Sequence, residues 1–166
     1  MQEIEALNIL HRDLATRNVL VHSIDGEDQS RLWIKITDFG LARHGKEVWS
    51  DDGEVPWRWT APEAFESYYW CTKSDVWSFG VTLWEIFSNA LIPFCEISED
   101  EELHRRVFGK ERLRLAPPDH TPASVYEIML LCWQHNHAHR PTFSQLLLML
   151  HEASDAHCIH GGLFVI

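Results

Sequence analysis

The sequence lacks the features that would place it in a membrane or on nucleic acid. It has no apolar run near the roughly 20 residues that a membrane-spanning helix needs. It carries 14 Lys and Arg residues against 25 Asp and Glu residues, with a net charge of -11 and no basic run. Because nucleic acids and anionic lipid surfaces attract basic proteins, we expect no nucleic-acid partner and no direct membrane contact.

Cysteine is also sparse, and its spacing shows no pairs. The chain contains Cys71, Cys95, Cys132 and Cys158, and its first residues show no signal peptide. Disulfide frameworks belong to small secreted proteins with closely spaced cysteines. We therefore expect free thiols and a cytoplasmic location, either for the chain itself or as the intracellular part of a membrane receptor in a longer parent.

Two β-branched runs predict a hairpin. Residues 19–21 and 32–36 flank a polar stretch with an Asp-Gly turn signal at 25–26. Pairing of the two runs would bring Asn18, just before the first strand, close to Asp38, just after the second. Carboxylate and amide oxygens are ligands that Mg²⁺ accepts.

Most of the remaining chain predicts helices. Residues 1–10 read as the end of a helix that runs into residue 11 without a turn. Residues 74–88 are apolar on nearly every face, which is typical of a buried central helix. Thr72 and Asp75 resemble a capping box at its start. We predict an α+β fold, predominantly helical, with one short β-hairpin.

The sequence also predicts the structure of the segments before and after this central helix. Residues 41–60 predict a long irregular loop, since Pro56 and Pro62 prevent a continuous helix. Further helices are expected to begin at 98–101, at 121–122 and at a capping box over 142–145.

Six short motifs follow one another in a fixed order. They are HRDLATRN at 11–18, DFG at 38–40, APE at 61–63, DVWSFG at 75–80, Cys-Trp at 132–133 and Arg-Pro-Thr-Phe at 140–143. In this order they resemble the larger lobe of a protein kinase domain, in which HRD…N is the catalytic loop and DFG the metal-binding turn. The resemblance implies a partial kinase domain over residues 1–153 and a C-terminal tail over 154–166.

The type of kinase can be narrowed by a few positions. Ser/Thr kinases usually carry a lysine where this chain has Ala15, and Arg17 before the asparagine resembles tyrosine kinases. The P-x-R-W-T-A-P-E stretch at 56–63 resembles their substrate loop. The resemblance implies transfer of the γ-phosphoryl group of ATP to tyrosine in protein substrates, with Mg²⁺ as cofactor and Mn²⁺ as its alternative.

The resemblance also assigns roles to single residues. Asp13 would accept the proton of the substrate hydroxyl, with Arg17 beside it and Asn18 completing the catalytic set. Asn18 and Asp38 would hold the metal on the ATP phosphates, and Leu20 would lie beneath the adenine ring. The peptide would lie on a loop formed by Pro56, Trp57, Arg58 and Trp59.

Other residues would keep the site in shape. By the same resemblance, Asp75 would accept backbone N–H groups of the catalytic loop, and Glu63 and Arg140 would form a buried ion pair. The structural and regulatory set also includes His11, Arg12, Phe39 and Gly40.

The loop over residues 41–60 contains no tyrosine. In the family, a phosphorylated tyrosine there often pairs with the arginine of HRD. One hypothesis is that Asp51 or Asp52 pairs with Arg12 and orders the loop without phosphorylation, because a carboxylate supplies part of a phosphate's charge. The alternative is a solvated loop tip.

The chain shows no counterpart of the family's Gly-rich loop, phosphate-binding lysine or partner glutamate. These belong to the small lobe, which would precede Met1. We therefore expect weak ATP binding and little turnover from the chain alone, and apolar surface that a small lobe or another protein covers. A non-catalytic kinase-like interaction module and a truncated gene product remain the alternatives to an enzyme.

Overall fold

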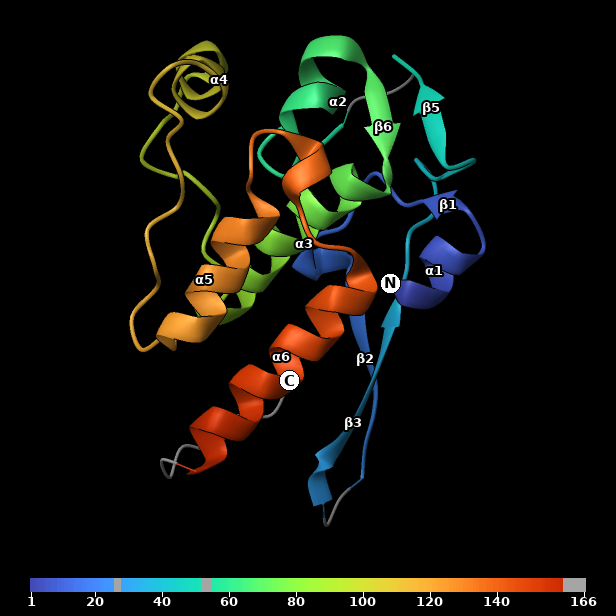
Figure 1. The fold of residues 1–166 in the computed structure, drawn as a ribbon, viewed down its shortest axis with the longest axis vertical. Coiled ribbons are helices and arrows are strands. Elements are labelled where there is room, and N and C mark those ends of the chain that lie inside the picture. The colour runs from blue at the N-terminus through green and yellow to red at the C-terminus, as the bar shows by residue number, and fades with distance from the viewer. Residues whose placement is uncertain (26–27, 52–54, 160–166) are drawn as a thin grey trace.

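The computed structural model describes residues 1–25, 28–51 and 55–159. Its helices are α1 (Gln2–Ala6), α2 (Pro62–Ser67), α3 (Thr72–Phe87), α4 (Asp100–Phe108), α5 (Ala123–Cys132) and α6 (Phe143–Ile159), with 3-10 turns η1 (Thr16–Asn18) and η2 (His137–His139). Its strands are β1 (Ile9–Leu10), β2 (Val19–Asp25), β3 (Asp28–Ile36), β4 (Arg43–His44), β5 (Glu47–Trp49) and β6 (Tyr69–Cys71). The predicted α+β fold with a β-hairpin is confirmed, and the hairpin extends away from the helices (Figure 1).

Strands β2 and β3 form the predicted hairpin. They are antiparallel, with Val19 opposite Ile36 and Val21 opposite Ile34, and both strands are longer than the β-branched runs. The glycine of the Asp-Gly turn signal lies outside the described residues. The register places the chain just before β2 next to the chain just after β3, as expected.

Helix α3 is the centre of the core. Val76, Val81 and Leu83 are almost completely buried, and α3 makes close contact with α5. In Figure 1 it lies between α5 and the β6 strand that leads into it. The prediction of a buried central helix is therefore confirmed.

The start of α3 differs from the prediction. The capping box is formed by Cys71 and Ser74, and the Cys71 N–H donates to Ser74 Oγ at 3.2 Å. Thr72 lies one residue inside the helix, and Asp75 is not part of the cap. The carboxylate of Asp75 is instead directed at the loop that follows β1.

Two predictions of local structure are wrong, both because distant partners decide them. Helix α1 does not run into residue 11, since Asn8 adopts a left-handed φ of 53° that ends it and starts β1. The stretch 41–60 is not wholly irregular, because β4 pairs with β1 and β5 pairs with β6. Short strands of this kind carry little sequence signal, since their pairing partners lie far along the chain.

The later helices begin close to their predicted starts. At α6 the capping box is confirmed, because Thr142 N–H donates to Gln145 Oε1 at 2.8 Å and Gln145 N–H donates to Thr142 Oγ1 at 3.2 Å. Helix α6 continues past residue 153 to Ile159. Among the described residues, no helix combines the length and the apolar character needed to cross a membrane.

Gly80 allows α3 and α5 to approach closely, and this generates a prediction. A Cβ at position 80 would lie 2.6 Å from Cys132 Cβ and 2.8 Å from Trp133 Nε1. Alanine gains about 1 kcal/mol of helix propensity over glycine, but overpacking a buried contact costs about 1–3 kcal/mol. We expect Gly80→Ala to lower the urea midpoint of unfolding. A midpoint equal to that of the native chain would contradict this close packing.

Candidate active site

The loop at residues 11–18 is anchored to α3 by one buried carboxylate. Asp75 accepts the backbone N–H of His11 at 2.8 Å on Oδ2 and the backbone N–H of Arg12 at 2.9 Å on Oδ1. These are the contacts expected of Asp75. Arg12 has a left-handed φ of 67°, a conformation that non-glycine residues rarely adopt, so the two hydrogen bonds hold a strained turn.

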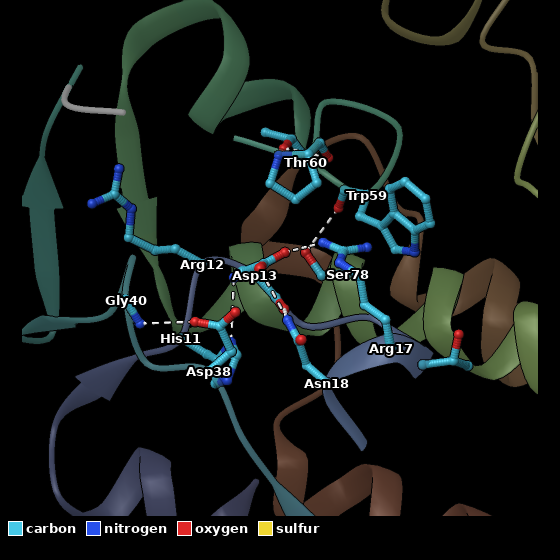
Figure 2. Close-up of polar contacts among 12 residues, drawn as sticks. His11, Arg12, Asp13, Arg17, Asn18, Asp38, Gly40, Trp59, Thr60 and Ser78 are labelled. Carbon is cyan, nitrogen blue, oxygen red and sulfur yellow. Dashed lines mark hydrogen bonds and ion pairs between the residues drawn. The ribbon is translucent and has the colours of Figure 1, made fainter. Parts of the chain in front are cut away.

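Asp13 is held from two sides. Arg17 Nη2 donates to Asp13 Oδ1, and Asn18 Nδ2 donates to Asp13 Oδ2 at 2.9 Å and to its backbone carbonyl at 2.7 Å (Figure 2). The Arg17 side chain is partly exposed, whereas Asn18 is buried. The orientation of the Asp13 carboxylate, whose side chain is 14% exposed, is therefore fixed by two neighbours.

The hairpin brings Asn18 and the segment after β3 together. Thr37 N–H donates to the Asn18 carbonyl at 2.9 Å, one residue before Asp38. Asp38 has a left-handed φ of 60°, and its Oδ1 accepts Gly40 N–H at 3.2 Å. Both N–H bonds of the Asn18 amide are directed at Asp13, which leaves the Asn18 side-chain oxygen for another ligand.

The remaining residues of this turn lie around the same loop. His11 Nε2 is 3.1 Å from the Thr37 carbonyl, and its ring lies 4.9 Å from the Phe39 ring. Phe39 itself is exposed, and so is Leu20 on β2. Leu20 therefore has an open face in this structure.

Arg12 has contacts with two other parts of the chain. Its guanidinium lies 4.5 Å from the Trp70 ring centre, and its Nη1 donates to the Leu41 carbonyl at 3.3 Å. Of the two carboxylates suggested as its partners, Asp52 lies outside the described residues. The pairing of Arg12 with Asp51 or Asp52 stays a prediction.

The loop at residues 56–59 is held by hydrogen bonds to the segment that precedes α4. Arg58 donates hydrogen bonds to the carbonyls of Pro93, Phe94 and Ile97 at 2.8–2.9 Å. Arg58 therefore connects this loop to the segment before α4 and does not join the Asp13 cluster. The centre of the Trp57 ring lies 4.4 Å from the Arg58 guanidinium carbon.

An open hollow of about 610 Å³ borders this loop. Its lining combines apolar and acidic side chains, from Val55, Trp57, Phe65, Asp100, Glu101 and His104. The hollow connects the loop with α2 and α4.

Trp59 connects this loop to the loop at residues 11–18, through a residue that the sequence analysis missed. Trp59 Nε1 donates to Glu85 Oε2 at 2.9 Å, and the Arg17 guanidinium carbon lies 4.9 Å from the Trp59 ring centre. Glu85 on α3 is only 6% exposed and also binds Thr16. An acidic residue between the apolar Trp84 and Ile86, in a helix predicted to be buried, is a signal that could have identified it.

Glu63 and Arg140 form the expected buried ion pair. Arg140 Nη1 and Nη2 donate to the two Glu63 oxygens at 2.7 and 2.8 Å, and the two side chains are 0% and 12% exposed. Ser74 Oγ donates to Glu63 Oε1 at 2.9 Å. The pair joins the start of α2 to the turn before α6.

Comparison with known proteins reveals clear relatives. Residues 1–150 match the family described as protein tyrosine and serine/threonine kinase. The chain is 37% identical to vascular endothelial growth factor receptor 2 of Mus musculus, over 98% of this chain and 12% of that protein. It is 41% identical to megakaryocyte-associated tyrosine-protein kinase of Mus musculus, over 89% of this chain and 27% of that protein. It is 37% identical to the tyrosine-protein kinase transforming protein Fps of Fujinami sarcoma virus, over 86% of this chain and 16% of that protein.

The ion pair of Glu63 and Arg140 generates a prediction. Glu63→Gln would leave a buried guanidinium without its counter-charge, which typically costs about 3–5 kcal/mol. We expect a large drop in the free energy of unfolding, measured by urea denaturation. The matched control is Glu111→Gln, which removes an exposed partner of Arg106 and should leave the midpoint unchanged. Equal effects of the two substitutions would contradict the importance of burial here.

Proposed function

This chain belongs to the protein tyrosine and serine/threonine kinase family, and on this premise we propose that it is the large-lobe part of a protein tyrosine kinase. Joined to a small lobe, it transfers the γ-phosphoryl group of ATP to tyrosine side chains of protein substrates. The chain spans 12% to 27% of the length of the relatives it matches. The relatives named as tyrosine kinases, together with Ala15 and Arg17, support tyrosine as the acceptor.

The observation that carries this proposal is the fixed orientation of Asp13. Phosphoryl transfer depends mainly on positioning and on charge stabilisation. Arg17 and Asn18 each donate to one oxygen of the Asp13 carboxylate, which supports a role in which Asp13 orients the tyrosine hydroxyl and accepts its proton. Arg17 remains beside the acceptor and helps to place it.

Asn18 and Asp38 fit the requirements of a magnesium ion. Mg²⁺ takes oxygen ligands and usually only one or two from protein. The Asn18 side-chain oxygen and the Asp38 carboxylate are donors of this kind on adjoining ends of the hairpin. When bound, Mg²⁺·ATP supplies the phosphoryl group, and Mn²⁺ is the alternative metal. Leu20 provides an apolar floor beside the same end of the hairpin, suited to an adenine ring.

The peptide side of the site fits a tyrosine acceptor. A tyrosine side chain reaches farther from its backbone than serine does, so the peptide must lie farther from Asp13. The loop at residues 56–59 lies next to Arg17, since the Arg17 guanidinium carbon is 4.9 Å from the centre of the Trp59 ring. Its firm anchoring by Arg58 suits a platform for the substrate. We propose a cytoplasmic location for this activity, supported by free thiols at Cys71, Cys95 and Cys132.

A second function is favoured by exposed apolar side chains on the hairpin. Leu20, Val21, Trp33 and Ile34 on the hairpin are 52–68% exposed, and exposed apolar groups in one region indicate a partner. A small lobe is one such partner. A different protein would make the chain a non-catalytic interaction module, which is the alternative to an enzyme.

The first experiment measures phosphoryl transfer by the purified protein in which these 166 residues are joined to a small lobe, called the full-length protein below. With Mg²⁺·ATP we expect phosphorylation of a tyrosine peptide and not of the same peptide with serine in its place. Asp13→Asn should lower kcat by about 10²–10⁴-fold, as loss of a proton-accepting group does, without weakening ATP binding. Equal transfer to serine would contradict the acceptor class, and absence of transfer by the unsubstituted protein would favour the interaction module.

The second experiment tests these 166 residues alone. Much of the family's phosphate clamp comes from the Gly-rich loop and the lysine that the sequence lacks. We therefore expect the Kd for Mg²⁺·ATP to exceed about 1 mM in calorimetry. Tighter binding that is lost in Asp38→Ala would instead mean that the Asn18 and Asp38 end of the hairpin forms a usable nucleotide site by itself.

A further inference from the structure

Glu85 is a buried carboxylate whose hydrogen bonds lead out of its own helix. It lies near the end of α3 and is 6% exposed. Its Oε1 accepts Thr16 Oγ1–H at 2.9 Å, and its Oε2 accepts Thr16 N–H at 3.0 Å and Trp59 Nε1–H at 2.9 Å. Burying a carboxylate is costly unless donors surround it, and here the three donors come from two separate loops.

The first of these loops carries the proposed transfer residues. Thr16 is the first residue of η1, whose next two residues are Arg17 and Asn18. The N–H groups at the start of a helical turn have no partner within the turn. Glu85 supplies a partner for one of them and so fixes the position of η1 against α3.

The second loop carries the proposed peptide platform. Trp59 is held to α3 twice, because Ser78 Oγ–H donates to its carbonyl at 2.8 Å and Glu85 accepts its indole N–H. The free face of the ring lies against Arg17, whose guanidinium carbon is 4.9 Å from the ring centre. Arg17 in turn pairs with Asp13. One continuous set of contacts therefore leads from Glu85 through Trp59 and Arg17 to Asp13.

We propose that Glu85 is a positioning residue that fixes the separation between Asp13 and the peptide loop. The inference rests on the proposed tyrosine kinase function and extends it to a residue that touches neither substrate nor metal. Its carboxylate holds η1 and the Trp59 indole at one point, so the tyrosine hydroxyl meets Asp13 when the peptide lies on residues 56–59. In the part of the chain that the structure describes, the hydrogen bonds of Glu85 go to Thr16 and Trp59 and not to Asn18 or Asp38 on the nucleotide side of the site.

The test is steady-state kinetics of the full-length protein with a tyrosine peptide. Glu85→Leu removes all three acceptor contacts while keeping an apolar side chain of similar size. We expect kcat/KM for the peptide to fall by about tenfold or more, with KM for ATP within about twofold of the unsubstituted protein. Uniform damage to the domain would lower kcat/KM for the peptide and also raise KM for ATP, so the difference between the two substrates is the informative quantity.

Conservative variants distinguish the effect of losing the hydrogen bonds from the effects of losing the charge and of misfolding. In Glu85→Gln the side-chain carbonyl can accept from Thr16 N–H and the Trp59 indole, and the amide can donate to Thr16 Oγ, so we expect recovery to within about threefold. Trp59→Phe keeps a ring beneath Arg17 and loses only the indole N–H, so we expect a smaller loss in the same direction. Thr82→Val is the control, because Thr82 is also buried on α3 and, among the described residues, its hydroxyl bonds to the Ser78 carbonyl of the same helix and to neither loop.

The possible outcomes test the role of Glu85 and the proposed kinase function separately. Unchanged peptide kinetics in a folded Glu85→Leu protein would overturn the role of Glu85 and leave the kinase function intact, and so would a parallel rise in KM for ATP. If Glu85→Leu does not fold, Trp59→Phe decides, and native kinetics in that variant would overturn the inference. If the unsubstituted protein transfers nothing to tyrosine, the proposed function fails, and the inference falls with it.

Discussion

The acceptance of two backbone N–H groups by the buried carboxylate of Asp75 is the interaction on which the site depends. Burial raises the pKa of Asp75, while the N–H groups of Arg12 and His11 and the nearby cationic side chains act in the opposite direction. The carboxylate lies on the central helix, so the strained turn at Arg12 is fixed to the most buried part of the molecule. Everything that follows along the loop, including Asp13, begins from this anchor.

Helix α3 holds the loops of the site in the same way at other points along its length, through further polar side chains. Asp75, Ser78 and Glu85 hold two loops: Asp75 binds the start of the 11–18 loop, Ser78 binds the carbonyl of Trp59, and Glu85 binds both Thr16 and the Trp59 indole. The resulting site is organised by position rather than by unusual reactivity. This agrees with a chemistry in which alignment of acceptor and donor supplies most of the catalysis. Arg58 adds a second anchor for the 56–59 loop, and the ion pair of Glu63 and Arg140 joins the start of α2 to the turn before α6.

The sequence predicts the parts of this structure that depend on local patterns. The hairpin, the capping box at Thr142 and the buried helix follow from β-branched runs, cap chemistry and apolar content. The turn at Asn8 and the strands β4 and β5 were missed, because their conformations depend on partners far along the chain. Asp75 was assigned through the family resemblance, whereas Ser78 and Glu85 on α3 were missed for another reason. The helix was treated as apolar on all faces, although positions 75, 78, 82 and 85 are polar at spacings of three, seven and ten residues, which share one helix face.

The polar positions on this face of α3 and the apolar positions on its other faces differ in how freely they can be substituted. Residues on the other faces, such as Val76, Val81 and Leu83, contact the core and can exchange for other apolar side chains of similar volume at modest cost. Such exchanges leave Asp75, Ser78 and Glu85 in register with the loops that they hold. The composition of the core can therefore change while the geometry around Asp13 is kept.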